Sequence, residues 1–407
     1  MSNAPAAARQ DGDIRLSHGT EAFVHANAAL FAAGFATFVL LYAVQPLMPT
    51  FAASFGVSAA VASLSLSLTT GVLAGSLLIA GAASEAWSRK AMLVASLVAA
   101  SVLTLTSAVS PSWLMFLASR ALLGLALSGV PATAMAYLGE EMRPRSLALA
   151  MGLYVSGTGL GGLVGRLLAG AVTDLSGWRS ALALTGLIGL ACAGLVWRFL
   201  PASQRFVRQA PAVGGAARGY ATHLRRYPLP WLCVEGFLVM GSFVTMFNYI
   251  GFRLMAPPYD LSQTQVASLC LVYLFGIAAS TIMGALTARL GRHRLLLVSL
   301  LAMLGGTLLT GADAMWLVLG GLSLLAVGFF ASHSVVSAWV GAAASDARAQ
   351  ASALYLCAYY VGASVVGTLG GRVWAAGGWP GVTALTSTLL VVAVAVAWRL
   401  RPSHGGL

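Results

Sequence analysis

The stretch LYVSGTGLGGLVGRLLAGAVTDLSGW, residues 153–178, has a counterpart later in the chain, LYLCAYYVGASVVGTLGGRVWAAGGW, residues 354–379. The two align without a gap at an offset of 201. A second pair, GAASEAWSRK (81–90) and GALTARLGRH (284–293), repeats at an offset of 203. A repeat at half the chain length predicts two equivalent halves. In membrane proteins built from such repeats, the binding site lies between the halves, near the middle of the bilayer. The identical positions include Leu153 and Leu354, Tyr154 and Tyr355, Gly161 and Gly362, Gly177 and Gly378, and Trp178 and Trp379.

The composition around this repeat is that of a membrane protein. The chain is 59% hydrophobic and only 8% charged, whereas soluble domains carry about 25% charged residues. Apolar runs of about 20 residues recur, which is the length that an α-helix needs to cross a bilayer. These continuous runs exclude a β-barrel, whose strands alternate residue by residue. The sequence therefore predicts an all-α integral membrane protein.

We predict twelve transmembrane helices in two pseudo-symmetric bundles of six. The domains would be an N-terminal tail (1–25), a six-helix bundle (26–200), a linker loop (201–230), a second six-helix bundle (231–399) and a C-terminal tail (400–407). The expected spans are 26–48, 59–83, 91–109, 113–138, 147–173, 180–200, 231–254, 263–288, 295–311, 316–341, 351–376 and 381–399.

Charge placement predicts the orientation of these spans. The formal net charge is +12, and on the twelve-span arrangement 18 of the 23 Lys and Arg residues fall on one side. Lys and Arg concentrate in cytoplasmic loops, so both termini are expected in the cytoplasm. We expect the chain to be embedded in a lipid bilayer. A nucleic-acid partner is excluded, because no soluble basic domain exists to bind one.

Five stretches carry a family resemblance: LLYAVQPLMP (40–49), RALLGLALSGVP (120–131), SGTGLGGLVGRLLAG (156–170), EGFLVMGSFVTMFNYIGFRL (235–254) and GFFASHSVVSAWVG (328–341). Together they resemble the major facilitator superfamily, and within it the acriflavine-sensitivity (YnfM-type) branch of exporters. The resemblance covers essentially the whole chain. It implies proton-driven export of a small molecule across a bacterial inner membrane, with the proton gradient as energy source and no cofactor. We expect the chain to function as a monomer.

The loop between spans two and three carries a form of the superfamily's signature. That signature has glycine, three residues, aspartate, then glycine and basic residues. Here the positions of the signature are occupied by Gly81, Glu85, Ser88, Arg89 and Lys90. Glu85 replaces the aspartate, and Ser88 replaces the second glycine. The resemblance implies a cytoplasmic gating loop made by Gly81, Glu85, Arg89 and Lys90. Ordinary positive-inside basic residues are the alternative.

Arg120 is the only charge between Trp113 and Leu138. A charge at mid-bilayer costs about 2.5 kcal/mol or more, so it should face a cavity or a partner. Gly124, four residues on, shares its helix face and allows close packing. The resemblance implies that Arg120 takes part in proton coupling. Alternatively, Arg120 snorkels to the outer interface.

Arg166 lies at a similar depth in span five, beside a ridge of Gly157, Gly161 and Gly165. Such glycine ridges let helices pack closely. Arg166 occupies a position where the antiporter signature usually has glycine, and we expect it to line the substrate cavity. Arg372, near the outer end of span eleven, is expected to snorkel.

Glu235 is the only acid within a span, and His333 lies within span ten. Histidine titrates nearest neutral pH, and spans seven and ten both border the cavity in this fold. A Glu235–His333 pair that carries the coupling proton is therefore geometrically possible. Helix capping by Glu235 and packing of His333 are the alternatives.

An aromatic stripe in span one comprises Phe31, Phe35, Phe38, Tyr42 and Gln45, whose spacing puts all five on one helix face. Stacking on such rings would suit amphipathic or ring-bearing substrates; helix packing is the other interpretation. The predicted cavity residues are Tyr42, Gln45, Phe38, Arg166, Asn248, Tyr249, Tyr359 and Tyr360.

The leading hypothesis is a secondary transporter that exports a small amphipathic molecule or drug in exchange for protons. Proton-linked transport of a sugar or small organic anion is the alternative, because the first six spans offer two arginines and no acid. A non-transporting membrane sensor is the alternative of another class. The sequence contains no phosphate-binding Gly-x-x-x-x-Gly-Lys loop, and no metalloprotease or nucleophile-elbow motif. The chain is therefore expected not to be an enzyme, and its four isolated cysteines predict no metal site.

Overall fold

The computed structural model describes residues 16–84, 87–204, 206, 213–344 and 348–400. Within these residues, ten helices are long and apolar enough to cross a membrane. The helices are α1 (Glu21–Tyr42), α2 (Met48–Phe55), α3 (Ala59–Ser84), α4 (Arg89–Ala108), α5 (Trp113–Glu141), α6 (Pro144–Phe199), α7 (Val213–Arg225), α8 (Leu229–Leu254), α9 (Gln263–Ser268), a 3₁₀ turn (Leu269–Val272), α10 (Tyr273–Leu290), α11 (Arg292–Leu309), α12 (Met315–Ala343) and α13 (Arg348–Arg399).

Two of these helices, α6 and α13, double back at a glycine. Gly177 has a φ of 82° and Gly378 a φ of 57°, and this left-handed region favours glycine because a Cβ would clash there. Each helix therefore supplies two crossings, and the ten helices make twelve. The twelve-helix prediction is confirmed.

The first crossing begins and ends earlier than expected from the sequence. α1 ends at Tyr42 rather than near residue 48, and α2 forms a separate short helix with a proline in its first turn. Pro46 lies in the break and has no N–H to continue the helix. The eighth crossing is also interrupted, because the 3₁₀ turn separates α9 from α10. Both irregular segments lie at the same end of the molecule.

The expected glycine ridge packs α6 against α1. A Cβ on Gly157, Gly161 or Gly165 would overlap the backbone of Phe31, Phe35 or Val39, respectively. In the second half, a Cβ on Gly362 would likewise overlap the backbone of Phe237 on α8. Gly161 and Gly362 are equivalent in the repeat, so the same close approach builds both halves.

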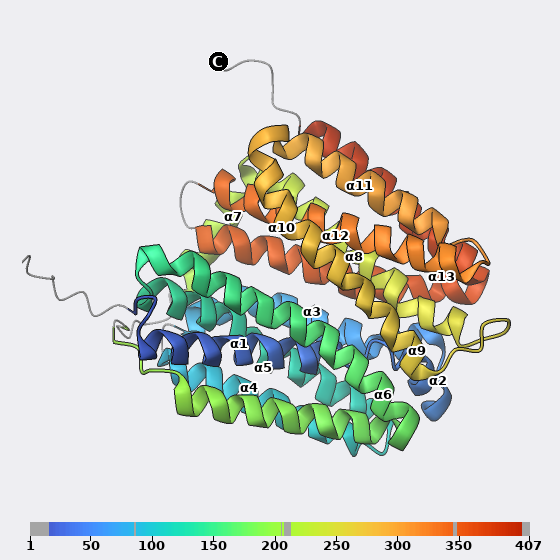
Figure 1. Ribbon diagram of the computed structural model, residues 1–407, viewed down its shortest axis with the longest axis horizontal. Coiled ribbons are helices and arrows are strands. Elements are labelled where there is room, and N and C mark those ends of the chain that lie inside the picture. The colour runs from blue at the N-terminus through green and yellow to red at the C-terminus, as the bar shows by residue number, and fades with distance from the viewer. Residues whose placement is uncertain (1–15, 85–86, 205, 207–212, 345–347, 401–407) are drawn as a thin grey trace, which may run out of the picture.

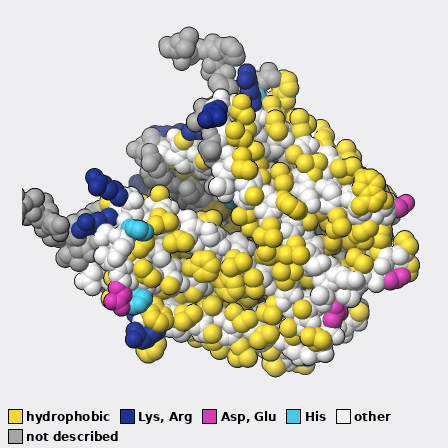
Figure 2. Space-filling view, viewed as in Figure 1, with side chains coloured by type: hydrophobic (Ala, Val, Ile, Leu, Met, Phe, Trp, Pro, Cys, Tyr) yellow, Lys and Arg dark blue, Asp and Glu magenta, His cyan; other side chains and the backbone are white. Residues whose placement is uncertain are grey.

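The two ends of the molecule differ in charge. Basic side chains gather at the end where α7 lies, whereas most acidic ones shown lie at the opposite end (Figure 2). We call these the basic end and the far end. Apolar side chains cover much of the surface between them (Figure 2), which suits the twelve crossings to a bilayer.

The halves meet at the far end, where α2 and α9 lie close together (Figure 1). Thr50 Oγ1 donates to Gln263 Oε1 at 2.8 Å. The Asp174 carboxylate, at the turn of α6, accepts from the backbone N–H groups of Gln263 (3.2 Å) and Thr264 (2.7 Å). Partial burial raises the pKa of Asp174, but these hydrogen bonds outweigh that effect and hold the pKa below its ordinary value. The structure is thus closed at the far end by polar contacts between the halves.

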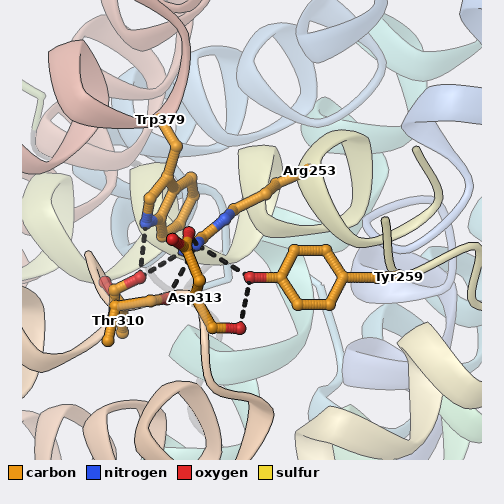
Figure 3. Close-up of polar contacts among 6 residues, drawn as sticks. Arg253, Tyr259, Thr310, Asp313 and Trp379 are labelled. Carbon is orange, nitrogen blue, oxygen red and sulfur yellow. Dashed lines mark hydrogen bonds and ion pairs between the residues drawn. The ribbon is translucent and has the colours of Figure 1, made fainter. Parts of the chain in front are cut away.

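A second far-end cluster fixes the C-terminal half (Figure 3). Arg253 donates to the carbonyls of Thr310 and Ala312 and to the hydroxyl of Tyr259. The Thr310 carbonyl also accepts from Trp379 Nε1 at 2.8 Å. These bonds tie the ends of α8 and α11 to the turn of α13 beside Gly378, so we expect this half to move as one body.

Candidate functional site

A polar cluster lies where the two halves meet within the membrane. Arg166 Nε donates to Gln45 Oε1 at 2.7 Å, and Gln45 Nε2 donates to Asn248 Oδ1 at 2.8 Å. Gln45 follows the end of α1, and Asn248 lies in the last two turns of α8. The two residues are 203 positions apart, close to the offset of the repeat, so they occupy comparable places in the two halves. The structure therefore brings together three predicted cavity residues on the axis between the halves.

Aromatic rings enclose the Arg166 guanidinium. It lies over the ring of Tyr42 at 4.3 Å and over that of Tyr273 at 5.1 Å, both within the range of cation–π attraction. Phe38 contacts Tyr42, with ring centroids 5.6 Å apart. Tyr273 was not among the predicted residues. It follows the 3₁₀ turn that interrupts the eighth crossing, and the sequence gives no signal for that interruption.

An aromatic wall extends from this cluster along the C-terminal half. Phe243 stacks on Phe329 at 3.7 Å and contacts Tyr273 at 5.4 Å. The Phe329 ring is parallel to that of His333, and His333 lies 4.8 Å from Tyr359. The predicted residue Tyr360 contacts Tyr359 edge-on at 5.2 Å. The wall thus joins α8, α10, α12 and α13.

Glu235 is fully buried on α8. Both carboxylate oxygens lack a hydrogen-bond partner among the described residues. Capping is therefore not what this side chain does in the structure. An ionised carboxylate without a partner is very costly in an apolar interior, so this arrangement suits the neutral, protonated acid.

Glu235 and His333 are not hydrogen-bonded to each other, but both adjoin Tyr355. His333 Nδ1 and Tyr355 Oη are 2.8 Å apart. Gly236, the chain neighbour of Glu235, packs on the Tyr355 ring. Tyr355 entered the sequence analysis only as the repeat counterpart of Tyr154 and was not among the predicted site residues.

Arg120 is fully buried and does not reach solvent. Its guanidinium donates to the backbone carbonyls of Ser65 (2.9 Å), Leu40 (3.2 Å) and Leu41 (3.1 Å). Leu40 and Leu41 are among the last four residues of α1, whose carbonyls have no partner inside the helix. Arg120 therefore caps the end of α1 just before Gln45. Its neighbour Gly124 packs against the backbone of Thr69 on α3.

The predicted residue Tyr249 is also fully buried. Its hydroxyl donates to the Gly367 carbonyl at 2.6 Å, and its ring packs against Gly370. These contacts join α8 to α13. In this conformation Tyr249 therefore packs between helices.

The gating-loop residues are partly described. Gly81 lies in α3, Lys90 is half-buried on α4, and Glu85 lies outside the described residues. Arg89 forms a bidentate ion pair with Glu140 of α5, with distances of 2.6 and 3.1 Å. The pair links α4 and α5 at the basic end.

The described residues contain no group of three or more His, Cys, Asp or Glu side chains that could hold a metal ion. The polar groups of the site are instead a guanidinium, two carboxamides, several phenols, an imidazole and one carboxyl. Such groups can bind a small molecule and exchange a proton.

Comparison with known proteins identifies the family. A sequence model of the Major Facilitator Superfamily matches residues 30–267 and 238–406. The Inner membrane transport protein YnfM of Escherichia coli K12 is 46% identical, over 95% of this chain and 92% of its own length. An Uncharacterized MFS-type transporter YybF of Bacillus subtilis 168 is 42% identical, over 92% and 93% of the two chains.

Solved structures share the fold. A bacterial homologue of the human lysosomal transporter Spinster, in an inward-facing and occupied conformation, superposes with a TM-score of 0.73 at 16% identity, over 94% of this chain and 97% of its own. The expected fold and resemblance are confirmed. This multi-pass membrane protein belongs to the major facilitator superfamily of secondary transporters.

Proposed function

We propose that the protein exports a small amphipathic molecule or drug from the bacterial cytoplasm in exchange for protons, by alternating access. The basic end and both termini face the cytoplasm, as the distribution of Lys and Arg favours. One chain contains both halves and the whole site between them, so the protein functions as a monomer. The proton gradient supplies the energy.

The buried Glu235 carboxyl carries this proposal. It has no hydrogen-bond partner among the described residues and no exposed surface. Burying an unpaired charge costs several kcal/mol, so the conformation closed at the far end favours the protonated acid. A conformation that admits water to Glu235 would favour ionisation and release the proton. This difference in proton affinity couples the conformation to the proton gradient.

The proton site and the polar cluster lie on one helix. Glu235 and Asn248 are 13 residues apart on α8, which corresponds to about 20 Å along the axis. α8 also packs along α13, which carries Tyr355 and Tyr359. A rigid-body rotation of this half therefore moves both sites together, which lets proton release and substrate binding influence each other.

At the basic end the linker helix α7 touches both halves. Tyr220 on α7 donates to the Leu78 carbonyl of α3 at 3.1 Å, and Gly219 packs against Gln350 of α13. The Arg89–Glu140 pair is separate and lies within the N-terminal half. We infer that α7 limits how far the halves separate on the cytoplasmic side.

Flux in proteoliposomes tests the proposal. Three probes represent three classes of substrate: benzenesulfonate is an aromatic anion, benzyltrimethylammonium an aromatic cation and D-xylose a neutral sugar. A pH gradient should drive at least one of them against its concentration gradient in the wild type. Glu235→Gln should abolish dependence on the gradient, and His333→Gln should flatten the pH profile between about pH 5 and 8.

The control is energy-independent exchange of the same probe, which Glu235→Gln should retain. A wild-type flux whose rate and direction do not change with the pH gradient would contradict proton coupling. Absence of flux for all three probes, in a protein that binds one of them, would favour a sensor over a transporter.

A further inference from the structure

Arg166 is a buried cation that has no acidic partner among the described residues. Three described arginines are buried: Arg89, Arg120 and Arg166. Arg89 pairs with Glu140, and Arg120 donates to three carbonyls. Arg166 uses Nε and Nη1, toward Gln45 and the Gly162 carbonyl. Its Nη2 receives no hydrogen-bond partner from any described residue, although a guanidinium offers five N–H donors.

Two further donors in the same cluster are also unpartnered. Asn248 Nδ2 and Tyr273 Oη lack a hydrogen-bond partner among the described residues, and these side chains are only 1% and 5% exposed. Asn248 is bonded to Gln45, and Tyr273 lies against Arg166. Buried polar groups normally find a partner, so these donors are suited to a ligand that accepts hydrogen bonds.

The other half does not balance the charge. Residue 367, the repeat equivalent of Arg166, is a glycine, and a Cβ there would lie 3.2 Å from Asn248 Nδ2. Glu235 lies about 20 Å away along α8, and Asp174 is about 12 Å along α6 at the far end. The cluster thus holds one positive charge on the axis between the halves.

The surface next to this charge is aromatic. Tyr42 and Tyr273 face the guanidinium, and the wall of Phe243, Phe329 and His333 continues from Tyr273. Rings of this kind favour stacking with a planar ligand. Ligand sites that combine an apolar lining with a few polar groups select ligands that have both an apolar and a polar part.

We propose that the substrate is a ring-bearing monoanion, whose carboxylate, sulfonate or phosphate binds Arg166, Asn248 and Tyr273 while its ring stacks on the adjacent aromatic wall. This inference rests on the proposed transport function and names its substrate class. Charge-assisted bonds to an anion would satisfy the donors that lack a partner. A permanently charged cation would meet Arg166 with like charge. A sugar would supply acceptors but no compensating charge.

The test measures binding to purified wild-type protein with four matched probes. Benzenesulfonate carries ring and charge, benzenesulfonamide the ring alone, methanesulfonate the charge alone, and benzyltrimethylammonium the ring with the opposite charge. Sulfonate stays ionised at all working pH values, which separates binding from proton uptake. We expect benzenesulfonate to bind tightest and to raise the unfolding temperature most.

Two variants and a control locate the binding. Arg166→Gln should weaken benzenesulfonate about 10- to 100-fold, and Arg166→Lys should weaken it less because it keeps the charge. Arg179→Gln is the matched control, because Arg179 contacts Trp178 and the Ser110 carbonyl at the far end. It should bind as the wild type does. If Arg166→Gln does not fold, the probe order in the wild type and Arg166→Lys still decides.

Tight binding of benzyltrimethylammonium that Arg166→Gln leaves undiminished would overturn the proposal, as would equal binding of benzenesulfonamide and benzenesulfonate. The proposed function can fail separately. Arg166-dependent binding of benzenesulfonate without flux driven by a pH gradient would keep the substrate class and reject proton coupling. Flux of benzyltrimethylammonium driven by the gradient, without benzenesulfonate binding, would keep proton coupling and reject the proposed substrate class.

Discussion

Replacing Arg120 with methionine removes the cap of α1 and leaves a long, flexible side chain in its place. Two buried carbonyls, those of Leu40 and Leu41, then lose the donor that the structure gives them. The Ser65 carbonyl lies inside α3, where the helix itself supplies a donor. The expected effect is therefore on folding and on the position of Gln45, which follows the end of α1.

The size of the effect follows from these contacts. A buried acceptor left unsatisfied costs about 1–3 kcal/mol, so two of them amount to about 2–6 kcal/mol. Removing the buried charge recovers part of its desolvation cost. We expect a net loss of about 2–4 kcal/mol for Arg120→Met. Arg120→Lys should lose less, because the ammonium keeps the charge but reaches fewer carbonyls.

Thermal unfolding of the purified protein, followed by tryptophan fluorescence, measures this loss. The apparent Tm should fall in the order wild type, Arg120→Lys, Arg120→Met. Arg372→Met is the control, because Arg372 is exposed and should unfold as the wild type does. An unchanged Tm for Arg120→Met, together with lost proton coupling, would refute the capping account and assign Arg120 to coupling.

Three further predictions address the proton site, the packing and the far end. Tyr355→Phe removes the hydroxyl beside His333 and should shift the pH profile of flux, whereas the repeat-equivalent Tyr154→Phe should not; equal shifts would reject a special role for Tyr355. Gly161→Ala should destabilise the protein by about 1–3 kcal/mol through overlap with α1, while Gly152→Ala, in open space, should be neutral or stabilising in the same unfolding assay. Asp174→Asn should increase the distance between spin labels on the far-end turns of the two halves. Because the pKa of Asp174 is lowered, its contribution to closure is present above the ordinary carboxyl pKa and is lost as pH falls through the lowered value; opening that is insensitive to both changes would contradict this contact.

Much of the fold could be predicted because the repeat and the apolar runs are local signals. The repeat identified Gly177 and Gly378, where α6 and α13 reverse. Helix ends were harder to predict. Pro46 ends the first crossing early, and nothing in the apolar run 263–288 distinguishes the 3₁₀ turn from helix. The linker helix α7 was not expected.

The site was harder to predict than the fold, because contacts between halves depend on tertiary packing. Arg166, Gln45 and Asn248 were each selected for polarity in an apolar run, and the structure joins them. The capping role of Arg120 depends on where α1 ends, and the sequence placed that end too late. Tyr355 contacts His333 and packs against Gly236, next to Glu235, although no spacing rule connects these residues.

The central claim is that Glu235 holds the exchangeable proton, and carbodiimide labelling tests it most directly. Dicyclohexylcarbodiimide reacts with protonated carboxyls in apolar surroundings, so peptide mass mapping should find the adduct on Glu235. Labelling should rise as the pH is lowered, and substrate that shifts the protein to a water-exposed conformation should change it. Labelling of Glu235 that is absent at every pH in folded, transport-active protein would contradict the account.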